Sequence, residues 1–202
     1  MYKDAMSPAA RSIKRLIDII VSFFGMVLMS PFFLIIWCAI KIEDGTGGIF
    51  KQERMGYKGK PFTIYKFRSM IVASEDNGVP QLCQEKDDRL TKVGRFLRDH
   101  HLDELPQLWN IFIGDMSLVG PRPERPYFAE KIMEQNPDYQ YVYLMHPGIF
   151  SPATLYNGYT DTMEKMLIRL RMDLEYLTNR SLWGDFKIIF LTVASIVTGK
   201  KF

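Results

Sequence analysis

The sequence predicts a mainly helical α+β fold, in which an apolar helical segment with a break at its middle precedes a domain with a short β-hairpin and amphipathic helices. The first observation is a charge-free apolar run over residues 19–40. The second is a pair of strand-like segments around a Gly-rich turn, and the third is a set of apolar residues at helical spacing near the end of the chain. We divide the chain into a poorly patterned N-terminus (1–10), a membrane segment (11–42) and a folded domain (43–202).

The composition limits the classes of protein to which the chain can belong. Its 202 residues are 47% hydrophobic and 24% charged, as in an average globular protein, which excludes disordered and fibrous chains. The net charge of +3 is too mild to indicate nucleic acid, but it suits anionic membrane lipids or phosphorylated substrates. Cys38 and Cys83 exclude a disulfide scaffold and are expected as reduced thiols. His100 and His101 are adjacent and diverge on a helix, so they do not predict zinc.

The apolar run is long enough to cross a membrane. As a helix, residues 19–40 would extend about 33 Å, against a bilayer core of about 30 Å. A cleaved signal peptide is not expected, because no small-x-small site ends the run. Pro31 at its middle has no N–H, so the Val27 carbonyl loses its helical partner, and the Ser30 hydroxyl can bond back to the Met26 carbonyl. We therefore expect a kink or break between two short arms.

Basic residues flank this run on both sides. A spanning helix requires one flank that is poor in Lys and Arg, so a re-entrant pair of helices with both ends in the cytoplasm competes with a Pro-kinked span. The residues alone leave both topologies open. Asp18, at the start of the run, is expected in an ion pair with Lys14 or Arg15. The flanking basic residues are Lys3, Arg11, Lys14 and Arg15 before the run, and Lys41, Lys51, Arg54, Lys58 and Lys60 after it.

The next elements predict a hairpin and two helices. A Gly-rich connector leads to strands over 49–54 and 61–67, which flank a turn at 56–59. A polar loop over 73–88 follows. Thr91 is the candidate N-cap of a helix that presents one apolar face, and a buried helix is expected over 105–113. The apolar face comprises Val93, Phe96, Leu97 and His100.

Two apolar stripes at helical spacing predict amphipathic helices near the end of the chain, over 163–177 and 186–197. Such stripes usually pack in a core. In a chain with a membrane segment, the last helix also suits the membrane interface, with Trp183 at headgroup level.

Asp103 and Glu104 head the densest group of chemically capable residues. They stand just before Pro106, which suits a first helical turn, so the structural interpretation makes Asp103 an N-cap. A functional interpretation is also open. Two carboxylates at a phosphate-binding helix start can hold Mg²⁺, and one of them can act as a nucleophile.

Cationic residues accompany this pair in the sequence. Arg98 lies five residues before Asp103, and Arg122 is held between two prolines, so it loses little entropy when it binds a phosphate. Lys66 and Arg68 fall on one face of the second strand. Each of these side chains could equally belong to solvated surface.

Three segments in order resemble the bacterial sugar transferases, or monotopic phosphoglycosyl transferases. They are Lys66–Met70 (KFRSM), Leu102–Asn110 (LDELPQLWN) and Gly114–Pro123 (GDMSLVGPRP), after an apolar run broken at Ser30-Pro31. The resemblance covers roughly residues 11–202 and is strongest up to Arg125. The length resembles the short members, which lack the extra transmembrane helices of larger ones.

The resemblance implies that a UDP-sugar gives its sugar-1-phosphate to undecaprenyl phosphate, that UMP is released, and that a cell-surface glycan begins. Asp103 would attack phosphorus and form a covalent phospho-sugar, while Asp103 and Glu104 hold Mg²⁺. Arg98 and Arg122 would bind phosphate, and Lys66 and Arg68 are further candidates for substrate binding.

The resemblance also implies a place for the protein in the cell. Ser30 and Pro31 would mark a re-entrant, monotopic helix break at the inner membrane, with residues 43–202 as a cytoplasmic catalytic domain. Downstream glycosyltransferases are the protein partners to expect.

One segment departs from the family pattern. Many members carry Arg-Pro-Gly-Ile-Thr-Gly late in the chain, where this sequence has His146-Pro147-Gly148-Ile149-Phe150-Ser151. The difference affects contacts to uridine and sugar, and it leaves the Asp-Glu pair untouched.

Two other functions compete with the transferase: a Mg²⁺-dependent membrane-associated pyrophosphate hydrolase, and a basic membrane anchor without enzymatic activity.

Overall fold

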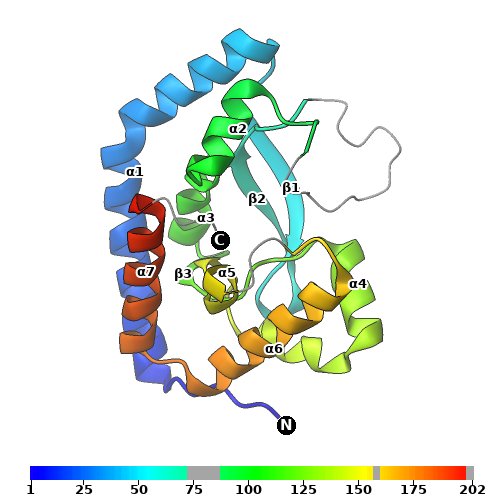
Figure 1. Ribbon diagram of the computed structural model, residues 1–202. Coiled ribbons are helices and arrows are strands. Elements are labelled where there is room, and N and C mark those ends of the chain that lie inside the picture. The colour runs from blue at the N-terminus through cyan, green and yellow to red at the C-terminus, as the bar shows by residue number, and fades with distance from the viewer. Residues whose placement is uncertain (72–86, 157–159, 199–202) are drawn as a thin grey trace.

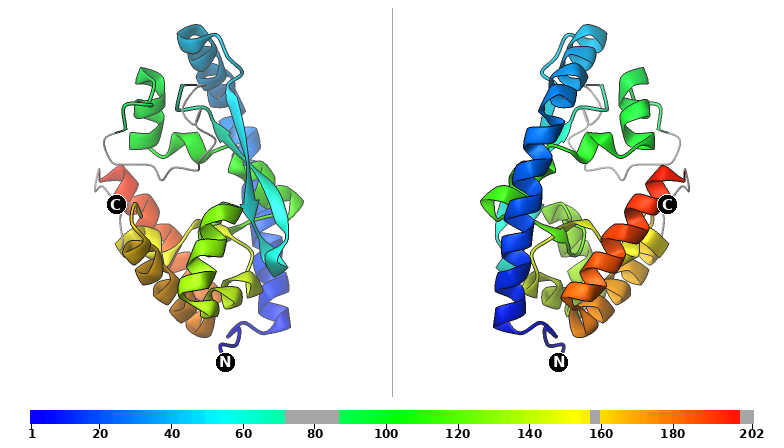
Figure 2. Two further views of the ribbon diagram at one scale, coloured as in Figure 1. Left: turned by 90° about the vertical axis from the view of Figure 1, so that its right-hand side faces the viewer. Right: turned by 90° about the vertical axis from the view of Figure 1, so that its left-hand side faces the viewer.

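A computed structural model describes residues 1–71, 87–156 and 160–198, and it confirms a mainly helical α+β chain (Figure 1). The long helix α1 lies along one side, and the strands and remaining helices pack beside it (Figures 1 and 2). The helices are α1 (Pro8–Asp44), α2 (Lys92–Asp99), α3 (Gln107–Ile113), α4 (Pro126–Gln135), α5 (Pro152–Tyr156), α6 (Met163–Asn179) and α7 (Leu182–Val197). The strands are β1 (Ile49–Met55), β2 (Pro61–Phe67), β3 (Ser117–Val119) and β4 (Gly148–Phe150), and the 3₁₀ turns are η1 (Tyr57–Gly59), η2 (Leu102–Glu104) and η3 (Pro137–Leu144).

Helix α1 continues through the expected break. Ser7 caps its start by accepting a hydrogen bond from the Ala10 N–H, and Pro31 lies inside one uninterrupted helix. In Figure 1 the helix bends along its length rather than separating into two arms. The Ser30 hydroxyl donates to the Val27 carbonyl at 2.8 Å and not to Met26, so it satisfies the acceptor that Pro31 leaves without a partner. Of the expected kink or break, the structure shows the kink: α1 is one continuous, bent helix and does not separate into two helices.

Helix α1 also carries a wide exposed apolar surface. Its most apolar 18-residue stretch has a mean hydropathy of 2.5, and 11% of that stretch is buried. Among the described residues it is the one helix that is long and apolar enough to cross a membrane. Exposure of such an apolar surface to water is unfavourable, so the helix suggests association with a membrane. The largest exposed apolar side chains include Phe24, Val27, Leu28, Phe32, Leu34 and Ile35.

The predicted hairpin is confirmed. Strands β1 and β2 pair antiparallel, with Ile49 opposite Phe67 and Met55 opposite Pro61. The turn between them uses Lys58 and Gly59 at positive φ, which is why a Gly-rich tetrapeptide connects the strands. Facing residues of the two strands share one side of the hairpin, and this places Arg54 on the same side as Lys66.

A short parallel pair was not predicted. Strand β3 pairs with β4, with Ser117 opposite Gly148 and Val119 opposite Phe150. Gly120 and Gly148 let these backbones approach closely, because a Cβ on either residue would collide with the other segment. The pair lies in a core with Ile64, Ile111 and other apolar residues from α3 and α6.

Helix α2 begins as predicted, with the Thr91 hydroxyl accepting from the Gly94 N–H. Its predicted apolar face is partly wrong. Leu97 is fully buried, whereas Phe96 is 57% exposed and packs against the His100 ring instead of the core. The Glu43 carboxylate accepts from the first N–H groups of α2 and so ties the end of α1 to this helix.

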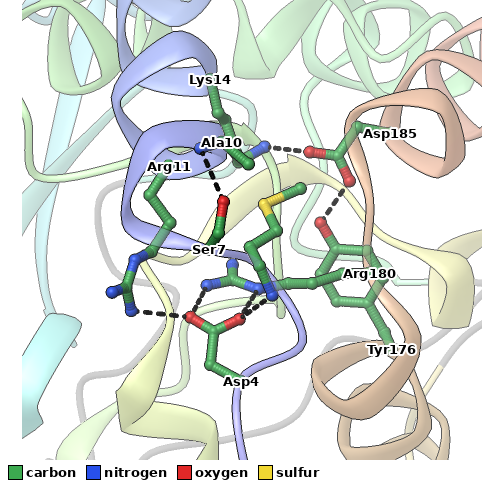
Figure 3. A network of polar contacts seen from close by, with 9 residues as sticks. Asp4, Ser7, Ala10, Arg11, Lys14, Tyr176, Arg180 and Asp185 are labelled. Carbon is green, nitrogen blue, oxygen red and sulfur yellow. Dashed lines mark hydrogen bonds and ion pairs between the residues drawn. The ribbon is translucent and has the colours of Figure 1, made fainter.

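Polar groups just before α1 and in its first turns bind one another and residues of other elements, as Figure 3 shows. Asp4 pairs with Arg180, which follows α6, and with Arg11 of α1. Lys14 pairs with Asp185 of α7, whose carboxylate also accepts from the Tyr176 hydroxyl. In Figure 2, α1 and α7 diverge from this end of the molecule.

Asp18 does not form the expected ion pair. Lys14 binds Asp185, and Arg15 donates to the carbonyls of Ile111 and Phe112. The buried Asp18 carboxylate instead accepts from the Leu118 N–H at 3.0 Å. This hydrogen bond attaches α1 to strand β3 of the folded domain.

Other predictions lie partly or wholly beyond the described residues. The loop over 73–88 falls almost entirely there, as do Cys83 and the last residues from 199 on.

Cys38 is an exposed free thiol on α1. The two terminal amphipathic helices are confirmed, and Trp183 and Phe186 stack on the exposed side of α7.

Candidate active site

Asp103 and Glu104 lie in the 3₁₀ turn η2, between α2 and α3. His101 at φ 55 turns the chain after α2, so that η2 packs against strand β2. Asp103 is not the N-cap of α3: that position is Pro106, and no side chain caps the helix. Asp103 is 5% exposed and makes no hydrogen bond to any residue that the structure describes. The capping prediction is wrong because Asp103 lies inside the turn η2, and α3 begins only at Gln107.

Glu104 receives two cations from different elements. Lys66 of β2 lies 2.6 Å from Oε1 of Glu104, and Arg122, on the loop after β3, lies 3.1 Å from the same atom. Burial acts to raise the pKa of Glu104, but the charges of Lys66 and Arg122 outweigh burial and hold that pKa well below its ordinary value. Glu104 is therefore a carboxylate fixed in place by its neighbours.

Asp103 has a different electrostatic environment. Burial, together with the negative charge of Glu104, raises the pKa of Asp103, and the charges of Lys66, Arg98 and Arg122 oppose this rise. The structure thus brings together four of the cations and carboxylates predicted from the sequence around Asp103.

A small, partly open hollow lies beside Glu104. We call it the cationic hollow, and it is lined by Arg54, Ile64, Lys66, Glu104, Gln107, Arg122, Pro123 and Gly148. Three of the lining residues are cations and one is an acid, so the hollow favours an anionic ligand.

Arg54 is a site residue that sequence reasoning missed. Its guanidinium donates to the carbonyl of Pro123 and to the side chain of Gln52, and burial lowers its pKa to about 10. The sequence did contain a signal that could have identified Arg54. Counting across the predicted hairpin turn puts Arg54 on the same face as Lys66.

Some predicted residues lie apart from this group. The Arg68 side chain donates to the Gly47 carbonyl after α1, and Arg68 does not line the cationic hollow. Ser30 and Pro31 lie on α1, within the apolar surface. Arg98 is close enough for its charge to act on Asp103.

A buried ion pair supports the Arg122 loop. Glu124, two residues after Arg122, accepts from Arg169 of α6, and both side chains are almost fully buried. Asp173 lies on the same helix, and burial raises its pKa to about 7 although Arg169 opposes the rise. Sequence reasoning missed this group because nothing in the sequence pairs residues 45 positions apart.

His146 begins the segment in which the sequence departs from the expected Arg-Pro-Gly pattern. Its ring stacks on Tyr57, with centroids 4.2 Å apart, and it does not line the cationic hollow. Burial lowers the pKa of His146 to about 4, helped by the charges of Arg15 and Arg180. At neutral pH the side chain is therefore an uncharged packing group.

Comparison with known proteins places this chain in a family. The family model described as bacterial sugar transferase matches residues 9–199. The chain is 40% identical over 193 residues to an Aeromonas hydrophila UDP-N-acetylgalactosamine-undecaprenyl-phosphate N-acetylgalactosaminephosphotransferase, covering 96% of this chain and 45% of the relative. It is 42% identical over 195 residues to an Escherichia coli K12 UDP-glucose:undecaprenyl-phosphate glucose-1-phosphate transferase, covering 96% of this chain and 42% of the relative.

The chain therefore spans less than half the length of these two relatives. It also resembles a Rhizobium leguminosarum exopolysaccharide production protein, PSS, with 38% identity over 197 residues. In that comparison the match covers 94% of this chain and 98% of the relative.

Proposed function

The chain belongs to the bacterial sugar transferase family, and from this premise we propose that it transfers sugar-1-phosphate from a UDP-sugar to undecaprenyl phosphate, with release of UMP. The product would begin a cell-surface glycan. The observation that carries the proposal is the Asp103–Glu104 pair, in which Asp103 is buried and Glu104 is partly exposed, surrounded by the charges of Lys66, Arg98 and Arg122.

The chemistry consists of two displacements at one phosphorus atom. In the first, a carboxylate oxygen of Asp103 bonds to the sugar-bearing phosphorus of the UDP-sugar, and the bond from that phosphorus to the bridging oxygen breaks. UMP leaves with the electron pair. In the second, a phosphate oxygen of undecaprenyl phosphate bonds to the same phosphorus, and the Asp103 carboxylate leaves with its electrons. Undecaprenyl diphosphate sugar and the free enzyme result, without a net proton transfer.

The division of contacts supports different roles for the two acids. Asp103 makes no hydrogen bond to a described residue, so its oxygens are free for attack, whereas Oε1 of Glu104 is held by Lys66 and Arg122. A carboxylate approaches a diphosphate against electrostatic repulsion. The cations of the hollow reduce that repulsion and stabilise charge that develops on the leaving phosphate.

Mg²⁺ is the cofactor that we propose for this site. Mg²⁺ is commonly bound by one or two carboxylates together with substrate phosphates, and Asp103 and Glu104 match that ligand chemistry. The described residues contain no cluster of three His, Cys, Asp or Glu side chains, so phosphate oxygens would have to complete the ligand set. Bound Mg²⁺ supplies neutralisation of diphosphate charge.

We propose that α1 enters and leaves the inner membrane from the cytoplasmic side. Its exposed apolar surface, its bent course with Pro31 inside the helix, and the basic residues on both flanks support this topology. Single cysteines at exposed positions Ile13 and Ile42, in a variant without Cys38 and Cys83, test it. Both should react with a membrane-impermeant thiol reagent only from the cytoplasmic side. Labelling of either from the periplasm would contradict a re-entrant helix.

Release of UMP from a panel of UDP-sugars tests the reaction. Without lipid, the wild type should release one UMP per active site and gain the mass of a phospho-sugar on Asp103. With undecaprenyl phosphate it should turn over. Asp103→Asn should fold, because Asp103 makes no hydrogen bond that holds the described structure together, and it should release no UMP. Asp99→Asn, at an exposed acid of α2, is the matched control and should behave as wild type.

Two outcomes would refute the proposal. Repeated UMP release without lipid would identify a pyrophosphate hydrolase. Turnover of Asp103→Asn near the wild-type rate would exclude a covalent intermediate on Asp103, and the lipid phosphate would then attack the UDP-sugar directly.

A further inference from the structure

We propose that Gln107 contacts the substrate, by donating a hydrogen bond from its carboxamide to the phosphoryl group that is transferred at Asp103. This inference rests on the proposed function. It begins from an unusual polar group. Gln107 is 2% exposed, and its buried Nε2 has no hydrogen-bond partner among the described residues. A buried amide without an acceptor is costly, so proteins rarely keep one without a reason.

A second buried amide on the same helix shows what a structural role looks like. The Asn110 side chain accepts from the Tyr65 N–H at 3.1 Å and donates to the Thr63 carbonyl at 2.7 Å. It thereby fixes α3 to strand β2. Gln107 lies one turn earlier on α3, is equally buried, and makes no such bond. The Gln107 carboxamide therefore does not hold the fold together.

The surroundings of Gln107 indicate which acceptor it lacks. Gln107 lines the cationic hollow, where Arg54, Lys66 and Arg122 are donors and Glu104 is the one acidic residue. Oε1 of Glu104 already accepts from two cations. A sugar hydroxyl would bring another donor into this hollow, whereas a phosphoryl oxygen only accepts. The phosphoryl group is thus the better match in both charge and hydrogen bonding.

The backbone places Gln107 beside the reacting carboxylate. Hydrogen bonds from Leu105 N to Leu102 O and from Leu108 N to Leu105 O continue helical turns from η2 into α3. Residues three and four apart on such turns share one face, so Gln107 follows Asp103 and Glu104 on the same side. Glu104, the neighbour of Asp103, lines the hollow together with Gln107, and two further lining residues, Lys66 and Arg122, act on Asp103 through their charges. A phosphorus atom bonded to the Asp103 carboxylate would therefore lie near the hollow.

Gln107→Met removes the donor and nearly keeps the volume. Its melting temperature should equal or exceed that of the wild type, because an apolar group replaces an unpartnered amide. First-turnover release of UMP per folded protein should fall by roughly 10- to 100-fold, as expected for a hydrogen bond to a charged group. Gln140→Met makes the same change at an exposed glutamine and should leave both quantities unchanged. Asn110→Leu should lower the melting temperature, since it breaks the bonds to β2.

An unchanged UMP rate in Gln107→Met would overturn the proposal, and so would a loss of melting temperature as large as that of Asn110→Leu. If the wild type releases no UMP from any UDP-sugar, the proposed function fails and a second measurement decides the role of Gln107. In that case inorganic pyrophosphate with MgCl₂ is titrated in a thermal-shift assay. Weaker protection of Gln107→Met than of the wild type supports the contact. Equal protection of both, or no protection of the wild type, refutes it.

Discussion

The Asp4 carboxylate offers a test of what holds the start of α1 to the folded domain. It pairs with two arginines in different environments (Figure 3). Arg180 lies after α6 and its side chain is 5% exposed, whereas Arg11 on α1 is 47% exposed. We predict that Arg180→Met destabilises the protein much more than Arg11→Met, although both remove a partner of the same carboxylate.

The exposed fractions of the two arginine side chains determine how much stability each substitution should cost. Removing one partner of a buried pair costs about 3–5 kcal/mol, and the lower end applies here because Asp4 keeps 11% of its side chain exposed. An exposed pair contributes roughly 0–1 kcal/mol. In a chain of this size 1 kcal/mol shifts the melting temperature by about 2–4 °C. Arg180→Met should therefore lower it by about 6–12 °C, and Arg11→Met by less than about 4 °C.

Thermal unfolding in detergent, followed by circular dichroism, measures both variants at low and high salt. High salt should remove the Arg11 effect and leave most of the Arg180 effect, since salt screens exposed pairs more than buried ones. Burial acts to raise the pKa of Asp4, but the hydrogen bond from Arg180 and its charge lower it overall. The stabilisation should therefore persist above the ordinary pKa of Asp and be lost as the pH falls through the lowered value.

Equal losses of melting temperature in the two variants would refute this reasoning. So would a loss in Arg180→Met that disappears at high salt. A double-mutant cycle with Asp4→Asn separates the pair from other contacts of Arg180, and a coupling energy near zero would show that Asp4 is not its principal partner.

Three further predictions concern other parts of the molecule. Burial raises the pKa of Asp173 to about 7, so the wild type should lose stability relative to Asp173→Asn, by up to roughly 4 kcal/mol, as the pH rises from 4 to 7. Parallel denaturant titrations across this range measure the difference, and curves that do not diverge would contradict it. Pro31→Ala restores an N–H partner for Val27 and should straighten α1 towards a span, so that a cysteine at one flank becomes labelled from the periplasm. Labelling that stays cytoplasmic at both flanks would show that packing sets the topology. Glu104→Gln should release UMP about 100-fold more slowly, with partial recovery in excess MgCl₂, and a wild-type rate would contradict its role.

The sequence predicted the elements whose signals are local. The hairpin follows from alternation on both sides of a Gly-rich turn, and α2 follows from its Thr91 cap. Strands β3 and β4 were missed because each has three residues, too few to show a period, and they pair across about 30 positions of the chain. Asp18 was misassigned for a related reason. Its neighbours along the helix suggested an ion pair, but its partner is the Leu118 N–H, 100 positions away.

The residues of the candidate site also divide into those that local motifs predicted and those whose position depends on the tertiary structure. Lys66, Arg122 and the two acids stand in recognisable motifs, and the structure brings them together. Arg68 stands in one of those motifs too, yet its side chain bonds to the connector after α1. Whether a motif residue faces the site depends on where its strand ends. Strand β2 ends at Phe67, so the alternation that places Lys66 at the site does not extend to Arg68.

Two adjacent acids in one turn raise the question of which is the nucleophile, and the sequence alone treats them alike. The structure separates them by their partners. Lys66 and Arg122 both bind Oε1 of Glu104, so they hold this carboxylate in place and draw negative charge from it, which makes it the weaker nucleophile. Asp103 has no such bond to lose. The two environments also act on the acids in opposite directions, raising the pKa of Asp103 and lowering that of Glu104, and such pairs commonly divide their work. These contacts are the reason for which we propose Asp103 as the nucleophile and Glu104 as the acid that keeps the cations in place.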